Sequence, residues 1–146
     1  MKKTLVVIVV SFLVPGAGLA CLGLSSGCGG IGLAYQKHLS GKYSLIATDI
    51  LEQMCISEPS GPNGWNGVIP QTVFAVGWDD RFIVAKQHPN KDHLYGLDKT
   101  ITNYYILRVS DGHRTGPLDE ASFKAERSNQ GVPESLAFTL VFDHLK

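Results

Sequence analysis

The sequence predicts a mainly β domain of the α+β class, an antiparallel meander sheet of about five to six strands with one short helix. Two observations predict this class. Short runs rich in β-branched and aromatic residues recur through residues 41–146, and glycine, proline, asparagine and aspartate separate them. Only residues 119–131 combine a helix-forming composition with capping residues at both ends.

The first strand is expected over residues 42–50 (KYSLIATDI), and residues 53–57 are expected to form a short strand that pairs with it. Residues 58–67 (EPSGPNGWNG) contain two prolines, three glycines and two asparagines, a composition typical of a loop. Trp65 in this loop has two open interpretations: it covers one end of the core, or it is an exposed binding residue.

The clearest pattern is a hairpin. Residues 71–78 (QTVFAVGW) and 81–87 (RFIVAKQ) are apolar runs separated by Asp79 and Asp80. Both alternating faces of these runs are apolar, so we expect the hairpin at the centre of the sheet, covered on both sides. The position of the two aspartates between strands favours a turn over a carboxylate pair for acid–base chemistry.

A polar loop is expected over residues 88–99, followed by a strand over residues 102–109 (TNYYILRV). Asp111 and Gly112 then form a turn that returns the chain through residues 113–116. This second hairpin extends the sheet beyond the first one.

The helix is predicted from its ends. Asp119 is a good N-cap residue, and Leu118 and Phe123 occupy the positions of a hydrophobic staple around it. Gly131 supplies the C-terminal stop. The closing run 136–142 (LAFTLVF) is expected to be a last strand paired within the sheet.

The N-terminal segment has the pattern of a bacterial lipoprotein export signal. Lys2 and Lys3 form a positively charged n-region, and residues 5–14 (LVVIVVSFLV) form an apolar core. Small residues follow this core before a cysteine. The pattern predicts a lipoprotein signal peptide over residues 1–27, and therefore export of the remaining chain.

Cys28 is the expected site of lipidation, and Cys21 is the alternative, because small residues precede each of them. We expect residues 28–40 to be the lipidated cysteine and a tether, and residues 41–146 to be a single domain. Acyl chains such as palmitate would then anchor the protein to the bacterial cell membrane or outer membrane.

Two other interpretations of the N-terminus stay open. Residues 4–36 have no charge, as an uncleaved anchor helix would require, but Pro15 and repeated glycines disfavour such a helix. Ordinary secretory cleavage near Ala20 would leave Cys28 free to pair with Cys55 in an oxidising compartment. The product would then be a soluble secreted inhibitor or immunity protein.

The charge balance excludes an electrostatic footprint for nucleic acid. The chain has 13 Lys and Arg against 13 Asp and Glu; without Lys2 and Lys3, residues 28–146 have 11 against 13. The expected partners are the membrane, through the lipid anchor, and an unknown envelope protein or ligand. We expect no cofactor, no metal and no catalytic residue, and so a non-enzymatic binding or accessory protein.

Aromatic residues are the candidates for partner binding: Trp65, Tyr104 and Tyr105. The two tyrosines are adjacent in a strand, so their side chains must face opposite ways. One of them would lie on an open face of the sheet, if such a face exists. The alternative is that both tyrosines pack beneath the helix and the loops.

His88, Asp92 and His93 are the nearest approach to a metal or catalytic cluster. We expect them to be solvated loop residues, because no third histidine or cysteine follows at a metal-binding spacing. An envelope hydrolase that uses His88 and His93 is the alternative function. Cys55 lies in an apolar sequence (MCI), which favours an inert, buried thiol.

Several short blocks together resemble a family of small, uncharacterised bacterial lipoproteins, classed as a domain of unknown function. The resemblance covers nearly all of residues 28–146 and implies a lipid-anchored domain of this size. It favours Cys28 over Cys21, whose apolar surroundings depart from the family pattern, and it implies no catalytic residues. The blocks are residues 26–29 (SGCG), 39–44 (LSGKYS), 68–70 (VIP), 76–87 (VGWDDRFIVAKQ), 103–107 (NYYIL), 116–118 (GPL), Phe123 and 132–136 (VPESL).

Overall fold

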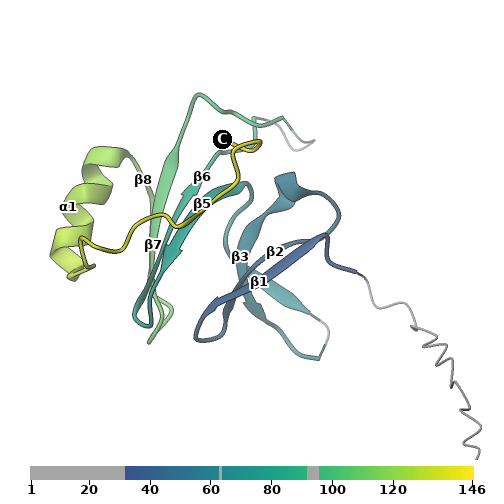
Figure 1. The fold of residues 1–146 in the computed structure, drawn as a ribbon, viewed down its shortest axis with the longest axis horizontal. Helices are drawn as coiled ribbons and strands as arrows, with labels where there is room; N and C mark the ends of the chain where they lie inside the picture. Colours follow the sequence, from purple (N-terminus) through teal and green to yellow (C-terminus); the bar gives the residue numbers. More distant parts are fainter. Residues whose placement is uncertain (1–31, 63, 92–95) are drawn as a thin grey trace, which may run out of the picture.

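The computed structural model describes residues 32–62, 64–91 and 96–146. In this part of the chain, nine strands form two antiparallel sheets, accompanied by helix α1 and a single 3₁₀ turn, η1 (Leu51–Gln53). Figure 1 shows three layers: α1, then the five-stranded sheet, then the four-stranded sheet. The mainly β class with one short helix is confirmed, but the strands divide between two sheets.

The first sheet has the order β1-β2-β3-β4. Its β2–β3 pairing matches the expectation, whereas β1 lies inside the segment that we expected to be a tether. The sequence of β1 (YQKHLS) has no apolar run, and only its last two residues are buried, so its composition gives no strand signal. The strands are β1 (Tyr35–Ser40), β2 (Tyr43–Ala47), β3 (Cys55–Pro59) and β4 (Trp65–Ile69).

The segment 58–67, expected to be a loop, is largely a hairpin between β3 and β4. The backbone N–H of Ser60 donates to the carbonyl of Gly64 at 2.9 Å and closes the turn. Proline and glycine are tolerated here because β4 is an edge strand, and because Pro59 lies beyond the part of β3 that pairs with β2. The loop expectation is therefore wrong for both ends of the segment.

The second sheet has the order β8-β7-β6-β5-β9. The β5–β6 hairpin is confirmed: Asp79 Oδ1 accepts hydrogen bonds from the N–H groups of Arg81 at 2.8 Å and Phe82 at 2.7 Å, as a turn residue does. Both of these strands are buried on both faces along most of their length. The strands are β5 (Val73–Trp78), β6 (Phe82–Gln87), β7 (Asn103–Arg108), β8 (Arg114–Leu118) and β9 (Leu140–Val141).

Helix α1 (Glu120–Gln130) begins and ends where its caps predict. The side chain of Asp119 accepts a hydrogen bond from the N–H of Ser122 at 2.7 Å, and Gly131 adopts a left-handed conformation with φ 69°. Phe123 is the buried residue of the helix, and it packs in one cluster with Leu118. The helix therefore covers the outer face of the second sheet.

The closing run forms a shorter strand than expected. Only β9 is regular, although the N–H of Thr139 donates to Val76 O at 3.1 Å and that of Phe142 donates to Phe74 O at 2.8 Å. A Cβ atom at Gly77 would lie 2.0 Å from the carbonyl oxygen of Ala137. The run therefore crosses Gly77 at close contact before it pairs with β5, which shortens the regular strand.

The core has two parts on opposite faces of the second sheet. The larger part fills the space between the two sheets and includes Leu45, Ile56 and Ile83. The smaller part lies between the second sheet and α1, around Phe123. None of the described helices is long and apolar enough to cross a membrane.

Candidate functional site

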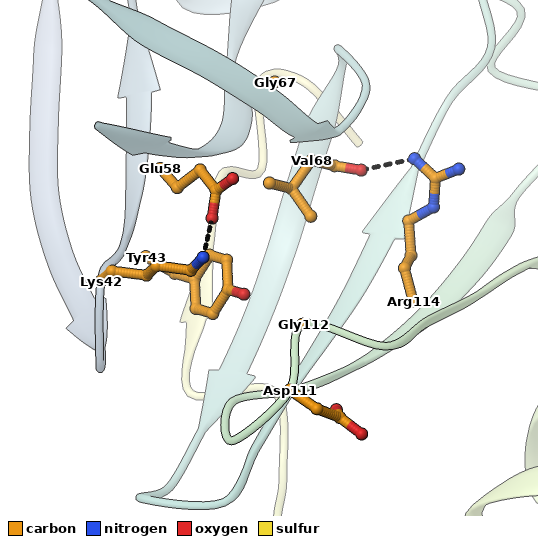
Figure 2. A pocket seen from close by; sticks show the side chains of 8 residues that line it. All are labelled: Lys42, Tyr43, Glu58, Gly67, Val68, Asp111, Gly112 and Arg114. Atoms are coloured by element: carbon orange, nitrogen blue, oxygen red, sulfur yellow. Dashed lines mark hydrogen bonds and ion pairs between the residues drawn. The ribbon is translucent and has the colours of Figure 1, made fainter. Parts of the chain in front are cut away.

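A polar groove lies between β4, the edge strand of the first sheet, and β8, the edge strand of the second (Figure 2). Its volume is about 440 Å³, within the usual range for small-molecule sites. We call it the edge groove. Four separate segments of the chain line it: Lys42, Tyr43, Glu58, Gly67, Val68, Asp111, Gly112 and Arg114.

One side of the edge groove is formed by an ion pair. Lys42, in the turn between β1 and β2, places its Nζ 2.6 Å from Glu58 Oε2 on β3. This hydrogen bond raises the pKa of Lys42. The lysine therefore stays protonated at neutral pH and cannot act there as a base or a nucleophile.

The other side of the edge groove is formed by Arg114 at the start of β8. Its Nη1 donates to the backbone carbonyl of Val68 at 2.6 Å and so joins the edges of the two sheets. A guanidinium has five N–H donors, and among the described residues Arg114 makes no ion pair with a carboxylate. Its charge is therefore available to a ligand.

The turn between β7 and β8 closes the lower end of the edge groove. Asp111 Oδ1 accepts from the N–H of His113 at 3.0 Å and lies 3.4 Å from Arg108 Nε. Gly112 has φ +73°, and a Cβ there would lie 2.8 Å from the hydroxyl oxygen of Tyr43. Tyr43 itself is buried, with the Nζ of Lys42 5.6 Å from its ring centroid (Figure 2).

The lining offers equal numbers of positive and negative groups: Lys42 and Arg114 against Glu58 and Asp111. Gly67 adds open space, because a Cβ at this position would meet no atom within 4 Å. Such a site can orient a polar ligand through charge-assisted hydrogen bonds. Because the charges of the four lining groups sum to zero, the site does not favour a highly charged ligand.

The three aromatic candidates lie elsewhere. Tyr104 is 9% exposed and packs on Phe123 of the helix, with ring centroids 4.8 Å apart; Tyr105 is 4% exposed and lies in the core between the sheets. Their opposite orientation is as expected, and burial raises the pKa of both hydroxyls. Neither ring forms an open surface patch. Trp65 is partly exposed at the start of β4, outside the groove lining.

His88 is not a solvated loop residue, so that expectation is wrong for it. Its backbone continues the β5–β6 pairing through hydrogen bonds with Thr72, and its ring stacks on Phe74 with centroids 4.2 Å apart. Its Nδ1 lies 2.6 Å from the carbonyl oxygen of Ile101. Asp92 and His93 lie outside the described residues, and within those residues no cluster of three metal-binding side chains occurs.

Cys55 is partly buried at the start of β3, with its Sγ 3.2 Å from the hydroxyl of Ser57. Burial raises the pKa of the thiol, so little thiolate forms at neutral pH, as in the inert interpretation. The two candidate lipidation sites, Cys28 and Cys21, lie outside the described residues.

The sequence does not predict that the residues of the edge groove form one site. The sequence predicts Asp111 and Gly112 only as a turn and places Glu58 in a loop. A local signal exists for each turn, whereas the convergence of Lys42 and Arg114 depends on how the two sheets pack. No spacing of residues in the sequence indicates how the two sheets pack against each other.

Comparison with known proteins identifies the domain but not its role. A family described as "Protein of unknown function (DUF3997)" matches residues 40–143, well over half of the chain. No curated protein and no solved structure matches the sequence or the fold. The match runs from the last residue of β1 to just beyond β9, and so includes every residue of the edge groove. The chain belongs to the DUF3997 family.

Proposed function

We propose that this protein is a lipoprotein of the bacterial envelope whose β domain binds a ligand in the edge groove without transforming it. The observation that supports binding is the state of the two cations of the groove. Lys42 forms an ion pair with Glu58, and among the described residues Arg114 donates to the neutral carbonyl of Val68 and pairs with no carboxylate. Permanently charged groups recognise and orient a ligand, whereas acid–base catalysis needs a group that exchanges a proton near neutral pH.

The N-terminal pattern supports the anchor. Two lysines, an apolar run and small residues precede Cys28, the order that a lipoprotein signal requires. Six residues separate Cys28 from Tyr35, the first residue of β1, so the extended linker reaches at most about 25 Å. A lipid on Cys28 would keep the domain close to the membrane surface and confine its ligands to that layer.

The anchor is tested by intact mass spectrometry of the protein purified from native membranes, with peptide mapping of its N-terminus. We expect a diacyl or triacyl group on Cys28, loss of this group in Cys28→Ala, and accumulation of the precursor with globomycin, which inhibits lipoprotein signal peptidase. Cys21→Ala serves as the control and should be processed normally. An unmodified N-terminus near residue 21 would refute the anchor.

The binding site is tested by thermal denaturation of the full chain in detergent with a panel of small polar compounds. A ligand at 100 times its dissociation constant stabilises the folded state by about 2.7 kcal/mol. Gly67→Val should abolish this gain, because the valine fills open space in the groove at a position without positive φ. Gly32→Val is the matched control, since a Cβ there also meets nothing within 4 Å. Equal stabilisation of wild type and Gly67→Val would exclude the groove.

A further inference from the structure

We propose that the ligand of the edge groove is the carboxy-terminal end of an extended peptide, which adds to the free edge of β4 and places its terminal carboxylate on Arg114. This inference rests on the proposed function of the groove as a binding site, and it specifies the chemical class of the ligand.

The first step of the argument is the free edge of β4. This strand pairs with β3 on one side, and within the described ranges no strand pairs with its other side. Asn66 and Gly67, in its middle, are exposed. The hydrogen bond from Arg114 to Val68 O links this edge to the second sheet at the surface, beside the packing of Val68 and Ile69 in the core between the sheets. Unpaired backbone groups at such an edge are a template for an added peptide strand.

The second step is an exchange of hydrogen bonds at Arg114. The guanidinium now donates one bond to a neutral carbonyl, whereas a carboxylate would receive two parallel bonds from it and also bring the opposite charge. A terminal carboxylate would therefore draw Arg114 away from Val68. The carbonyl of Val68 would then accept an N–H of the peptide backbone, so that neither group loses its partner.

The third step distinguishes a peptide from a simple anion. Glu58 and Asp111 line the same groove, and each keeps one carboxylate oxygen outside the contacts formed by the described residues. Phosphate would be repelled by both carboxylates, whereas a peptide offers N–H donors to them beside its single negative charge. Gly67 leaves room for a second backbone to approach closely, because a Cβ there would meet no atom within 4 Å.

The experiment is a titration of the full chain in detergent micelles, followed by the amide resonances of β4 and β8 and by calorimetry. The probes are Ala-Ala-Ala with a free carboxylate, the same tripeptide as its C-terminal amide, and inorganic phosphate. We expect the free acid to shift the resonances of Gly67, Val68 and Arg114 and to bind at least tenfold more tightly than the amide. Phosphate should shift none of them.

Three variants locate the contact. Arg114→Gln should reduce the affinity for the free-acid tripeptide to that for the amide. Arg114→Lys keeps the charge but loses the paired N–H donors of the guanidinium, so it should give an intermediate affinity. Arg81→Gln is the matched control, because Arg81 is exposed in the β5–β6 turn outside the groove lining. Gly67→Val should remove binding of both tripeptides. Since Arg114 is exposed at a sheet edge, its replacements should leave the fold intact. The dispersion of the amide resonances in the NMR spectrum of each variant will check this.

Four results would overturn the peptide proposal: equal affinity for the acid and the amide, an acid-to-amide ratio unchanged by Arg114→Gln, binding of phosphate alone, or no tripeptide binding. If one of these occurs while another compound still stabilises the chain in a manner that Gly67→Val abolishes, the groove remains the binding site and only the ligand class is wrong. If no compound in either experiment depends on Gly67, both proposals fail.

Discussion

Among the glycines that the structure describes, Gly77 is the one at which an added Cβ would lie nearest to another atom, and Gly77→Ala tests how the closing run is held. The added Cβ would lie 2.0 Å from Ala137 O, 2.8 Å from Ala137 C and 3.3 Å from Val84 Cγ2. Ordinary contacts between heavy atoms need about 3.5 Å, so the backbone near Ala137 must move by roughly 1.5 Å. No flexible side chain can absorb this movement, because the nearest atoms are backbone.

The expected destabilisation can be worked from these contacts. Overpacking of a filled core costs about 1–3 kcal/mol. Moving the chain at Ala137 also breaks the hydrogen bonds from Thr139 to Val76 and from Phe142 to Phe74, at about 1 kcal/mol each. The free energy of unfolding should therefore fall by about 3–5 kcal/mol in Gly77→Ala.

Urea denaturation at equilibrium measures this loss, and Gly67→Ala is the control with the same change of residue. A Cβ at Gly67 meets nothing within 4 Å, so Gly67→Ala should be neutral or stabilising by up to about 1 kcal/mol. Hydrogen exchange should show faster exchange of the Thr139 amide in Gly77→Ala only. A loss below about 1 kcal/mol at Gly77 would refute the close crossing of the closing run.

Three further predictions concern the helix and the thiol. Phe123→Ala should lower the free energy of unfolding by about 3–5 kcal/mol in urea, because this buried ring joins α1 to the second sheet; a loss below about 1 kcal/mol would contradict that packing. Asp119→Ala should lower the melting temperature at neutral pH, and the difference from wild type should vanish in acid. The hydrogen bond from the N–H of Ser122 holds the pKa of Asp119 in the folded state below its usual value. The carboxylate therefore stabilises the fold fully above its pKa in the unfolded chain, and this stabilisation is lost as the pH falls through its pKa in the folded chain. A difference that is constant with pH would refute this role of the carboxylate. Cys55 should react with iodoacetamide more slowly than glutathione at pH 7, and rapidly after unfolding, as peptide mass mapping will show; equal rates in the folded chain would refute its shielding.

The elements predicted correctly from the sequence are those with a local signal. The β5–β6 hairpin has a turn aspartate between two apolar runs, and α1 has Asp119 and Gly131 at its ends, so a few neighbouring residues suffice to define each. The β3–β4 hairpin was missed because the proline and glycine that indicate a loop are also tolerated at a sheet edge. β1 was missed because pairing with β2, and not its own composition, fixes it.

The division of the strands into two sheets could not be predicted for a related reason. Within β7, Tyr104 and Tyr105 give a strand buried on both faces, but the sequence does not say whether a helix or a second sheet covers each face. The structure places α1 over Tyr104 and the first sheet over Tyr105. The edge groove exists only as a consequence of that second layer, so its charged residues appear in the sequence as unrelated turns.

The two sheets are joined differently at their two pairs of edges, and this difference explains why the site lies between β4 and β8. Beside β1 and β9, Tyr35 packs edge-on against Phe142 with ring centroids 5.4 Å apart. At β4, Ile69 and Val68 pack in the core between the sheets, and outside that core the described link between β4 and β8 is the hydrogen bond from Arg114 to Val68 O. An apolar contact can be opened only by exposing its surface to water, whereas an exposed hydrogen bond can exchange partners at little cost. A ligand with a carboxylate and a backbone N–H can therefore enter at β4 and β8 while the aromatic contact keeps the sheets together.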